Sequence, residues 1–230
     1  MGIITCPRIQ VAGVLNLDEA LMLARLGVDS IGLPMRLAVH PEDVDEDEAG
    51  RIARALPPQV LPVCITYAVD PLEIDALCRA LGVSAVQLHS DMPPAALAAL
   101  KARCPRLFVI KSIIVPPAPD AIALEALVTQ ALALAPHSDA LLTDSLDPAT
   151  GATGATGRTH DWEASRRLAL ASPRPLIMAG GLTPDNVAAA VAAVRPAGVD
   201  AHTGLEDAAG RKDPALVADF VGAARAALSH

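Results

Sequence analysis

Short apolar runs and longer amphipathic stretches alternate along the whole chain. The apolar runs have the length and composition of strands, and they cover Arg8–Val14, Ser30–Leu33, Val60–Ile65, Ala85–Leu88, Leu107–Ser112, Ala140–Thr143, Pro175–Met178 and Gly198–Ala201. The stretches between them repeat apolar residues at spacings of three and four, which is typical of helices that bury one side. They cover Asp18–Leu26, Asp45–Leu56, Pro71–Leu81, Pro93–Arg103, Ala121–Ala135, Trp162–Ala171, Pro184–Val194 and Pro214–Leu228.

This strict alternation predicts an α/β fold of parallel strands joined by helical crossovers. Several of the strands are near-continuous apolar runs, as expected when helices cover both faces of a sheet. Eight strand–helix units in 230 residues indicate a single (β/α)8 TIM barrel that spans residues 1–230 as one domain. An open, doubly wound sheet is the alternative fold. We find no linker-like stretch that divides the chain.

Local signals at the helix ends support these boundaries. Asn16 precedes the first predicted helix. Thr183 precedes the seventh, where a threonine can cap the helix, and Pro184 fits its first position. Gly27 and Gly82 stand where the first and third helices are expected to end.

Two connections are longer than the others, Pro34–Val44 and Ser145–Asp161. Both follow the carboxyl ends of predicted strands, which is the active-site face of a barrel. Long loops at such positions are commonly functional. The Gly/Ala/Thr repeat of the second loop predicts a flap over that face.

Composition narrows the classes of function. Hydrophobic residues make up 52% of the chain and the mean hydropathy is +0.40, yet polar residues interrupt every apolar run well before the roughly 20 residues that span a bilayer. The formal net charge of -8 argues against a nucleic-acid surface or an anionic membrane as partner. We see no signal peptide, and the four cysteines fit neither a CxxC motif nor a zinc pattern. We therefore expect a cytoplasmic protein with reduced thiols.

Two glycine-containing segments in the last quarter predict an anion site. Gly180 and Gly181 follow the seventh strand and precede a helix start, where free backbone N–H groups favour phosphate. Thr203 and Gly204 follow the eighth strand. The loops after these two strands are the usual phosphate site of a TIM barrel. The alternative is that Gly180 and Gly181 form only a tight turn.

Motifs in shared order identify a family resemblance over nearly the whole chain. The matching stretches are Gly13–Ala20, Val86–His89, Val109–Lys111, Leu141–Ser145, Thr156–Trp162, Ala179–Val187 and Gly198–Asp213. In this order they resemble the phosphoribosylanthranilate isomerase family, barrel enzymes of tryptophan biosynthesis. The resemblance implies an isomerase that opens a phosphorylated aminoaldose and moves a proton to form an aminoketose. Such a reaction needs a general acid for the ring oxygen and a general base for the proton on carbon 2.

The resemblance assigns the general acid and leaves the general base open. Asp144 matches the family's acid at the end of the sixth strand; a capping or turn carboxylate is the alternative. The family's base is the cysteine of a Lys-Ile-Cys-Gly motif, and here that motif begins with Gln10 and has Ala12 in place of the cysteine. Alanine cannot accept a proton. Cys6 precedes the first strand and is a poor substitute.

Other parts of the family pattern also differ. Glu42 or a neighbour stands where the family has an arginine for the anthranilate carboxylate, and Arg36 is a possible replacement. His160 occupies the place of the usual Phe before Asp-Trp. Because aromatic residues make up only 2% of the chain, a pocket for an anthranilate ring is less expected than the resemblance alone suggests.

Among the candidate replacements for the base, His40 and His89 are expected near the active-site face. The alternatives are a solvated turn for His40 and a wall of the site for His89. Lys111 offers Schiff-base chemistry in principle. The positions of His40, His89 and His202 do not define a metal site, so we expect no metal and no cofactor.

The sequence therefore predicts an isomerase with Asp144 and His40 as catalytic residues. Phosphate and substrate would contact Gly180, Gly181, Thr203, Gly204, Arg36 and His89. The alternatives are a paralogue with another phosphosugar substrate, as isomerase or lyase, and a non-catalytic protein that binds a phosphorylated metabolite. The expected partner is a phosphorylated small molecule, with no nucleic acid or membrane, and the expected assembly is a monomer or a homodimer.

Overall fold

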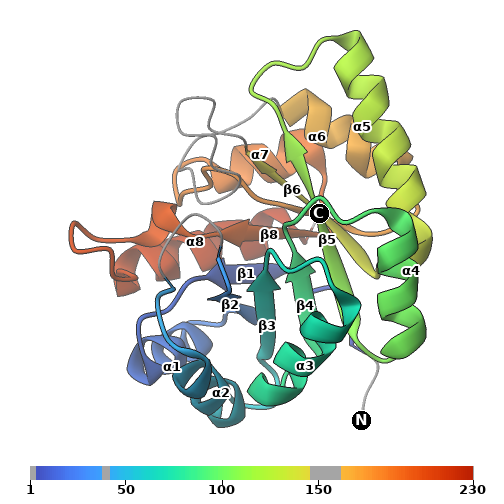
Figure 1. The fold of residues 1–230 in the computed structure, drawn as a ribbon. Coiled ribbons are helices and arrows are strands. Elements are labelled where there is room, and N and C mark those ends of the chain that lie inside the picture. Colours follow the sequence, from blue (N-terminus) through green and yellow to red (C-terminus); the bar gives the residue numbers. More distant parts are fainter. Residues whose placement is uncertain (1–3, 38–41, 146–161, 230) are drawn as a thin grey trace.

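The chain forms a closed barrel of eight parallel strands, β1 to β8 in sequence order, in a computed structural model that describes residues 4–37, 42–145 and 162–229 (Figure 1). The strands are β1 (Ile9–Ala12), β2 (Ser30–Met35), β3 (Leu61–Thr66), β4 (Ala85–Leu88), β5 (Phe108–Val115), β6 (Ala140–Ser145), β7 (Leu176–Met178) and β8 (Gly198–Ala201). Closure occurs between β1 and β8, where Gln10 pairs with Asp200. The (β/α)8 prediction is confirmed, and the open sheet is excluded.

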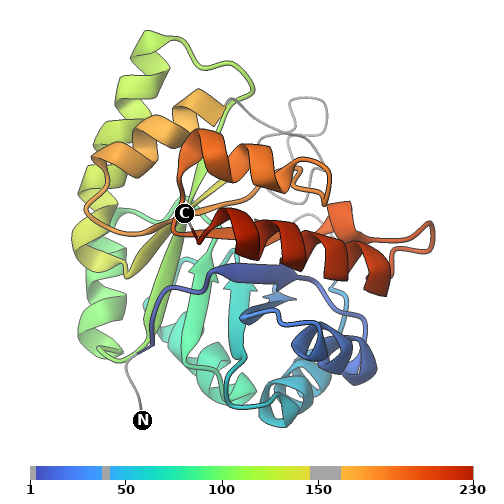
Figure 2. The same cartoon turned by 180° about the vertical axis from the view of Figure 1, so that it is seen from behind.

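Helices surround the barrel on its outer side, as the two opposite views show (Figures 1 and 2). They are α1 (Leu17–Arg25), α2 (Glu46–Ala55), α3 (Pro71–Leu81), α4 (Pro94–Arg103), α5 (Ala121–Leu134), α6 (Trp162–Ala171), α7 (Val187–Val194) and α8 (Pro214–Ala227), with short 3-10 helices η1 (Ala135–His137) and η2 (Thr203–Leu205). Within the described ranges, no helix is long and apolar enough to cross a membrane.

Alternation along the strands divides the core into two layers. One side of each strand packs against the helices, for example through Leu141, Met178 and Val199. The other side fills the barrel interior, where Ala140, Leu142, Ile177 and Ala179 belong to a separate apolar cluster. A polar residue on the interior side of a strand is therefore held inside the barrel.

Several element ends follow the sequence signals, and some do not. The side chain of Asn16 accepts a hydrogen bond from the backbone N–H of Glu19 at the start of α1, and Gly82 ends α3 in a left-handed conformation. The first strand ends at Ala12 rather than at Val14, because Gly13 has φ +74° and leaves the extended conformation.

The start of α7 also differs from the prediction. This helix begins at Val187, so Thr183 is not its cap. Instead, the backbone N–H of Thr183 donates to Oδ1 of Asn186 at 2.9 Å, and the Nδ2 of Asn186 donates to the carbonyl of Gly181 at 2.9 Å. The side chain of Asn186 thus holds the preceding loop in a turn.

Candidate functional site

The loops after β7 and β8 pack directly against each other. Gly180 and Gly181 have φ values of +94° and +62°, a region in which glycine is favoured. A Cβ added to Gly204 would collide with the carbonyl oxygen of Leu182 and lie 3.1 Å from the methyl carbon of Thr183. The structure therefore brings together the two segments that the sequence predicted as a phosphate site. Phosphate binding itself stays a prediction.

Asp144 lies on the interior side of β6, near its carboxyl end, and is only 5% exposed. Its Oδ1 accepts a hydrogen bond of 2.7 Å from the backbone N–H of Ser145. Burial raises the pKa of Asp144 to about 7, although the Ser145 hydrogen bond opposes this rise. A carboxyl group with this pKa is partly protonated at neutral pH and suits general acid chemistry.

Asp200 is a second buried carboxyl group inside the barrel, and sequence reasoning missed it. Its pKa is raised well above the usual range, first by burial and then by the negative charge of Asp144, while a hydrogen bond with Gln10 opposes the rise. Its Oδ1 is buried without a hydrogen-bond partner among the described residues. The signal in the sequence was one acidic residue on the interior side of an otherwise apolar strand.

A chain of polar contacts crosses the barrel interior next to these carboxyl groups. The Nε2 of Gln10 donates to Oε1 of Gln87 at 2.6 Å, and the hydroxyl of Ser30 donates to Oε1 of Gln10 at 3.2 Å. The Nε2 atoms of Gln87 and His89 lie 2.7 Å apart. Gln10 thus links β1 and β2 to β4 inside the barrel.

His89 continues this chain toward the carboxyl end of the barrel. Its ring stacks on Tyr67 with a centroid distance of 5.5 Å. Burial and the positive charge of Lys111 lower the pKa of His89 to about 3. The ring is therefore neutral at physiological pH, and it offers a hydrogen bond rather than a positive charge to any ligand.

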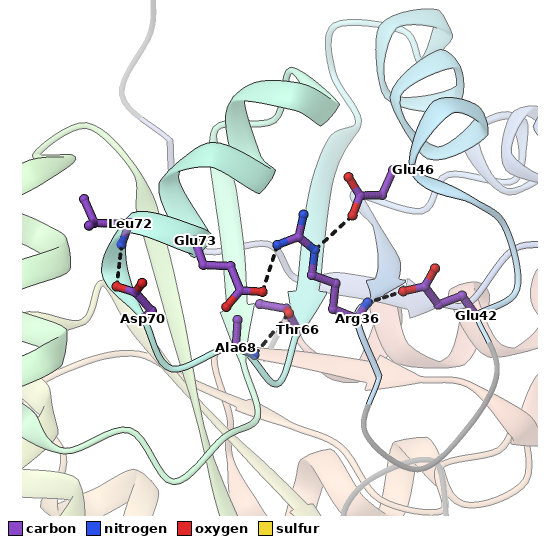
Figure 3. Close-up of polar contacts among 8 residues, drawn as sticks. All are labelled: Arg36, Glu42, Glu46, Thr66, Ala68, Asp70, Leu72 and Glu73. Atoms are coloured by element: carbon purple, nitrogen blue, oxygen red, sulfur yellow. Dashed lines mark hydrogen bonds and ion pairs between the residues drawn. The ribbon is translucent and has the colours of Figure 1, made fainter.

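Arg36 follows β2 with φ +54° and is held by acidic side chains (Figure 3). Its Nε lies 2.9 Å from Glu46 and its NH1 2.8 Å from Glu73, so its guanidinium joins the starts of α2 and α3. Its backbone N–H donates to the carboxylate of Glu42. Hydrogen bonds with both glutamates raise the pKa of Arg36. Its role in substrate binding stays a prediction.

The remaining predictions from the sequence concern Lys111, His40, the flap loop and a metal site. Lys111 is buried and donates to the carbonyls of Ser112 and Leu88 at 2.7 and 3.3 Å. Burial lowers the pKa of Lys111 to about 8. His40 lies outside the described residues, and so does the predicted flap loop Ser145–Asp161 with His160, except for Ser145, which ends β6. Among the residues that are described, no group of three or more His, Cys, Asp or Glu side chains could hold a metal ion.

The end of β1 carries Ala12, the position at which the resemblance implied a general base. Ala12 is 6% exposed and lies beside Gly32, on which a Cβ would stand 3.2 Å from the Cβ of Ala12. His202 lies close by, against the backbone of Gly13. Sequence reasoning weighed His202 only as a metal ligand.

The closed barrel, with Asp144 and Asp200 buried in its interior and a pair of glycine loops at one end, defines a (β/α)8-barrel protein with a candidate catalytic face. A family model described as N-(5'phosphoribosyl)anthranilate (PRA) isomerase matches residues 10–223. The chain belongs to this family.

Relatives of known sequence and structure agree with this assignment. The chain is 38% identical over 218 residues to N-(5'-phosphoribosyl)anthranilate isomerase 2 of Methanosarcina mazei, covering 93% of this chain and 92% of the relative. It is 36% identical to the isomerase of Haloarcula marismortui, covering 93% and 94%. The phosphoribosyl anthranilate isomerase structure from Thermotoga maritima is 27% identical, with a TM-score of 0.79 and coverage of 96% of this chain and 100% of that one.

One solved relative contains a ligand. A phosphoribosyl anthranilate isomerase in complex with reduced 1-(o-carboxyphenylamino)-1-deoxyribulose 5-phosphate is 25% identical to this chain. Its TM-score is 0.77, and the match covers 96% of this chain and 100% of that one.

Proposed function

We propose that this protein is an isomerase that converts a phosphorylated aminoaldose into an aminoketose, with N-(5'-phosphoribosyl)anthranilate as the first substrate to test. The single observation that carries the proposal is the environment of Asp144. Its carboxyl group lies on the interior side of β6, is almost completely buried, and has a pKa of about 7. An acid that retains its proton near neutral pH can protonate a sugar ring oxygen as the ring opens.

The glycine loops supply the second part of the proposal. The backbone N–H groups of Gly180, Gly181 and Gly204, with the hydroxyl of Thr203, would hold the phosphate at the ends of β7 and β8. Backbone donors of this kind bind a dianion without requiring a positive net charge. They bind substrate and transition state alike, and therefore position the sugar over Asp144 rather than driving the proton transfer.

His89 and Arg36 would contact the remainder of the substrate. The neutral ring of His89 can donate or accept a hydrogen bond. Arg36 would have to retain a free donor for a substrate carboxylate while paired with Glu46 and Glu73. His40 remains a predicted catalytic residue on the basis of the sequence.

Two observations favour a second candidate, a paralogue that isomerises another phosphorylated sugar. Ala12 replaces the family's base, and the Arg36 guanidinium is engaged by two glutamates. Such an enzyme would retain the phosphate loops and Asp144 but would not need the anthranilate carboxylate clamp.

The test combines growth with purified protein. The gene is expressed in a tryptophan auxotroph that lacks this isomerase, beside an Asp144→Asn variant, and the purified protein is assayed with N-(5'-phosphoribosyl)anthranilate. Growth and turnover that depend on Asp144 support the first candidate. Folded protein without growth or turnover contradicts it, and Asp144-dependent turnover of another phosphorylated aldose would then support the second candidate.

A further inference from the structure

The row of residues that contains Ala12 also contains a histidine. The pairing of β1 with β8 sets Gln10 beside Asp200 and Val11 beside Ala201. Continuing this register by one residue places Ala12 beside His202, and side chains that are two residues apart on a strand share a face. Asp200 points into the barrel, so His202 lies on the same side at the barrel mouth.

The contact between His202 and Gly13 confirms this proximity independently of the register. A Cβ added to Gly13 would collide with Nε2 of His202, and it would lie 3.0 Å from Oδ2 of Asp43. The imidazole therefore lies directly on the backbone that follows Ala12. Only a residue without a side chain leaves this space for the ring.

A carboxylate that is paired with a buried lysine lies near the same nitrogen of the imidazole. The Nε2 of His202 lies 3.3 Å from Oε1 of Glu206, and the same oxygen lies 2.6 Å from Nζ of Lys212. The side chain of Lys212 is only 2% exposed. A base that is oriented by an adjacent acidic group is the usual arrangement for proton transfer in enzymes.

The segment that carries Glu206 and Lys212 is itself tied to the beginning of the barrel. Glu206 and Lys212 form an antiparallel bridge. The backbone N–H of Lys212 donates to Oε1 of Glu19 at 2.8 Å, and the other oxygen of Glu19 accepts from the backbone N–H of Leu15 at 2.7 Å. The position of His202 relative to β1 is therefore fixed from both sides.

We propose that His202 is the general base of the reaction, in place of the cysteine that the family carries at Ala12. The inference rests on the proposed function. After Asp144 has given its proton to the ring oxygen, the bond from that oxygen to carbon 1 breaks as the nitrogen lone pair forms the C=N bond, and the resulting open-chain protonated imine has a hydrogen on carbon 2. The imidazole takes this proton, the C–H electron pair forms a carbon–carbon double bond, and the electrons of the C=N bond return to nitrogen. Tautomerisation of the resulting enol gives the aminoketose.

Most of the other charged groups around His202 are engaged elsewhere. Glu206 is paired with Lys212, and Glu19 accepts two backbone hydrogen bonds. Asp43, from the loop after β2, also faces Gly13, and because burial raises its pKa it is the competing base. Asp200 lies one inward-facing position deeper than His202 and interacts with Gln10. Histidine is the side chain that enzymes most often use as a general base, and the imidazole of His202 lies against the backbone that follows Ala12.

The test uses the full chain and measures turnover, pH dependence and hydrogen exchange. His202→Asn is compared with wild type and with His137→Asn, which changes a histidine in η1 before β6. We expect His202→Asn to lower kcat by 100-fold or more, to remove the acid limb of the pH profile of kcat/KM, and to abolish exchange of the carbon 2 hydrogen with solvent. His137→Asn should match wild type in all three measurements.

A second experiment restores a base at the end of β1. Ala12→Cys combined with His202→Asn returns a thiol to the adjacent position. We expect the kcat of this double variant to be at least tenfold higher than that of His202→Asn alone, with a pH profile shifted to that of a thiol. Ala12→Cys combined with Asp144→Asn should recover nothing. Circular dichroism and thermal unfolding confirm that each variant is folded.

The outcomes separate the two proposals. Wild-type protein that turns over neither N-(5'-phosphoribosyl)anthranilate nor another phosphorylated aldose overturns the proposed function and this inference together. Wild-type turnover that Asp144→Asn abolishes but folded His202→Asn leaves unchanged overturns only the assignment of His202. A loss in His202→Asn with an unaltered pH profile and normal exchange also overturns it, because that pattern indicates a merely structural role.

Discussion

Asp144 and Asp200 belong to the same cross-strand row of the barrel, with Ala179 between them on β7. Thr143 on β6 pairs with Met178 on β7, which pairs with Val199 on β8. Asp144, Ala179 and Asp200 are the residues that follow these three, so they form the next row. Two carboxyl groups that share an apolar interior raise each other's cost of ionisation. The negative charge of Asp144 accordingly adds to the rise in the pKa of Asp200. The protein thus retains a proton here near neutral pH.

Asp144→Asn should stabilise the fold at high pH while it abolishes activity. The pKa of Asp144 rises from 3.8 to about 7 on folding, so the folded state binds more protons than the unfolded state between these values, and wild-type stability falls as pH rises through this window. The Asp144→Asn variant has no carboxyl group to ionise at this position, so its stability does not fall in this way. We expect it to be more stable than wild type by up to about 4 kcal/mol at pH 8, and by almost nothing near pH 4.

Urea unfolding at pH 4, 6 and 8 measures this difference. Asp200→Asn provides a comparison at the neighbouring carboxyl group and should show the same sign. A stability difference between Asp144→Asn and wild type that is independent of pH would contradict the raised pKa of Asp144.

Gly204→Ala should damage the proposed phosphate site through the backbone. The added Cβ collides with the carbonyl oxygen of Leu182, and a carbonyl cannot move aside without moving its loop. We expect a loss of about 1 to 3 kcal/mol of stability and at least a tenfold weaker affinity for inorganic phosphate, measured by calorimetry. The matched control is Gly222→Ala in α8, where nothing lies within 4 Å of the added carbon.

In that control, alanine is the better helix former and should raise stability slightly, by about 0.5 to 1 kcal/mol, with no change in phosphate affinity. Equal effects of the two substitutions on phosphate affinity would show that the contact between the β7 and β8 loops does not shape an anion site.

The barrel was predictable because its signals are local. Apolar runs and helical periodicity define the elements, and Gly82 marks the end of α3. The errors lie at boundaries. The fifth strand continues past Ser112 to Val115, because β-branched residues extend it, and α7 begins after Pro184, because Asn186 holds the preceding loop in a turn.

The sequence indicated only part of the candidate site. Paired glycines and a family resemblance indicated Gly180, Gly181 and Asp144. The interior roles of Gln10 and Asp200 depend on which face of a strand points inward. The neighbour of Ala12 depends on how the last strand pairs with the first. Neither relationship can be read from residues that are close in sequence.

His89 should make the fold sensitive to acid. Its pKa falls to about 3 in the folded state, whereas an unfolded chain protonates histidine near pH 6.5. The unfolded state therefore binds more protons in this window, and stability is lost as pH falls through it. Relative to His89→Gln, wild type should lose about 2 to 3 kcal/mol between pH 7 and pH 4.5.

Unfolding in urea at several pH values measures this loss, and glutamine retains the capacity to hydrogen bond with Gln87. His137→Gln is the control and should follow the wild-type pH profile. Parallel profiles for wild type and His89→Gln would mean that His89 is not the source of the acid sensitivity.

Gly13→Ala should disturb the imidazole of His202 beside β1. Gly82→Ala is the control for the backbone penalty of placing alanine at a positive φ. The two glycines have nearly equal φ values of +74° and +73°, so alanine carries a similar backbone penalty of about 1 to 2 kcal/mol at each. Nothing lies within 4 Å of a carbon added at Gly82, whereas the carbon at Gly13 meets Nε2 of His202. We expect both variants to lose stability, and only Gly13→Ala to lose kcat, by at least tenfold.

A double variant distinguishes the steric effect of the added methyl group from the loss of the proposed base. In Gly13→Ala combined with His202→Ala, the added methyl group no longer meets a ring, so the stability lost at Gly13 should be partly regained and the two substitutions should be non-additive. Activity should not return, because the base is then missing. Additive losses of stability would show that the alanine at position 13 does not press on His202, and recovery of kcat in the double variant would place the base elsewhere.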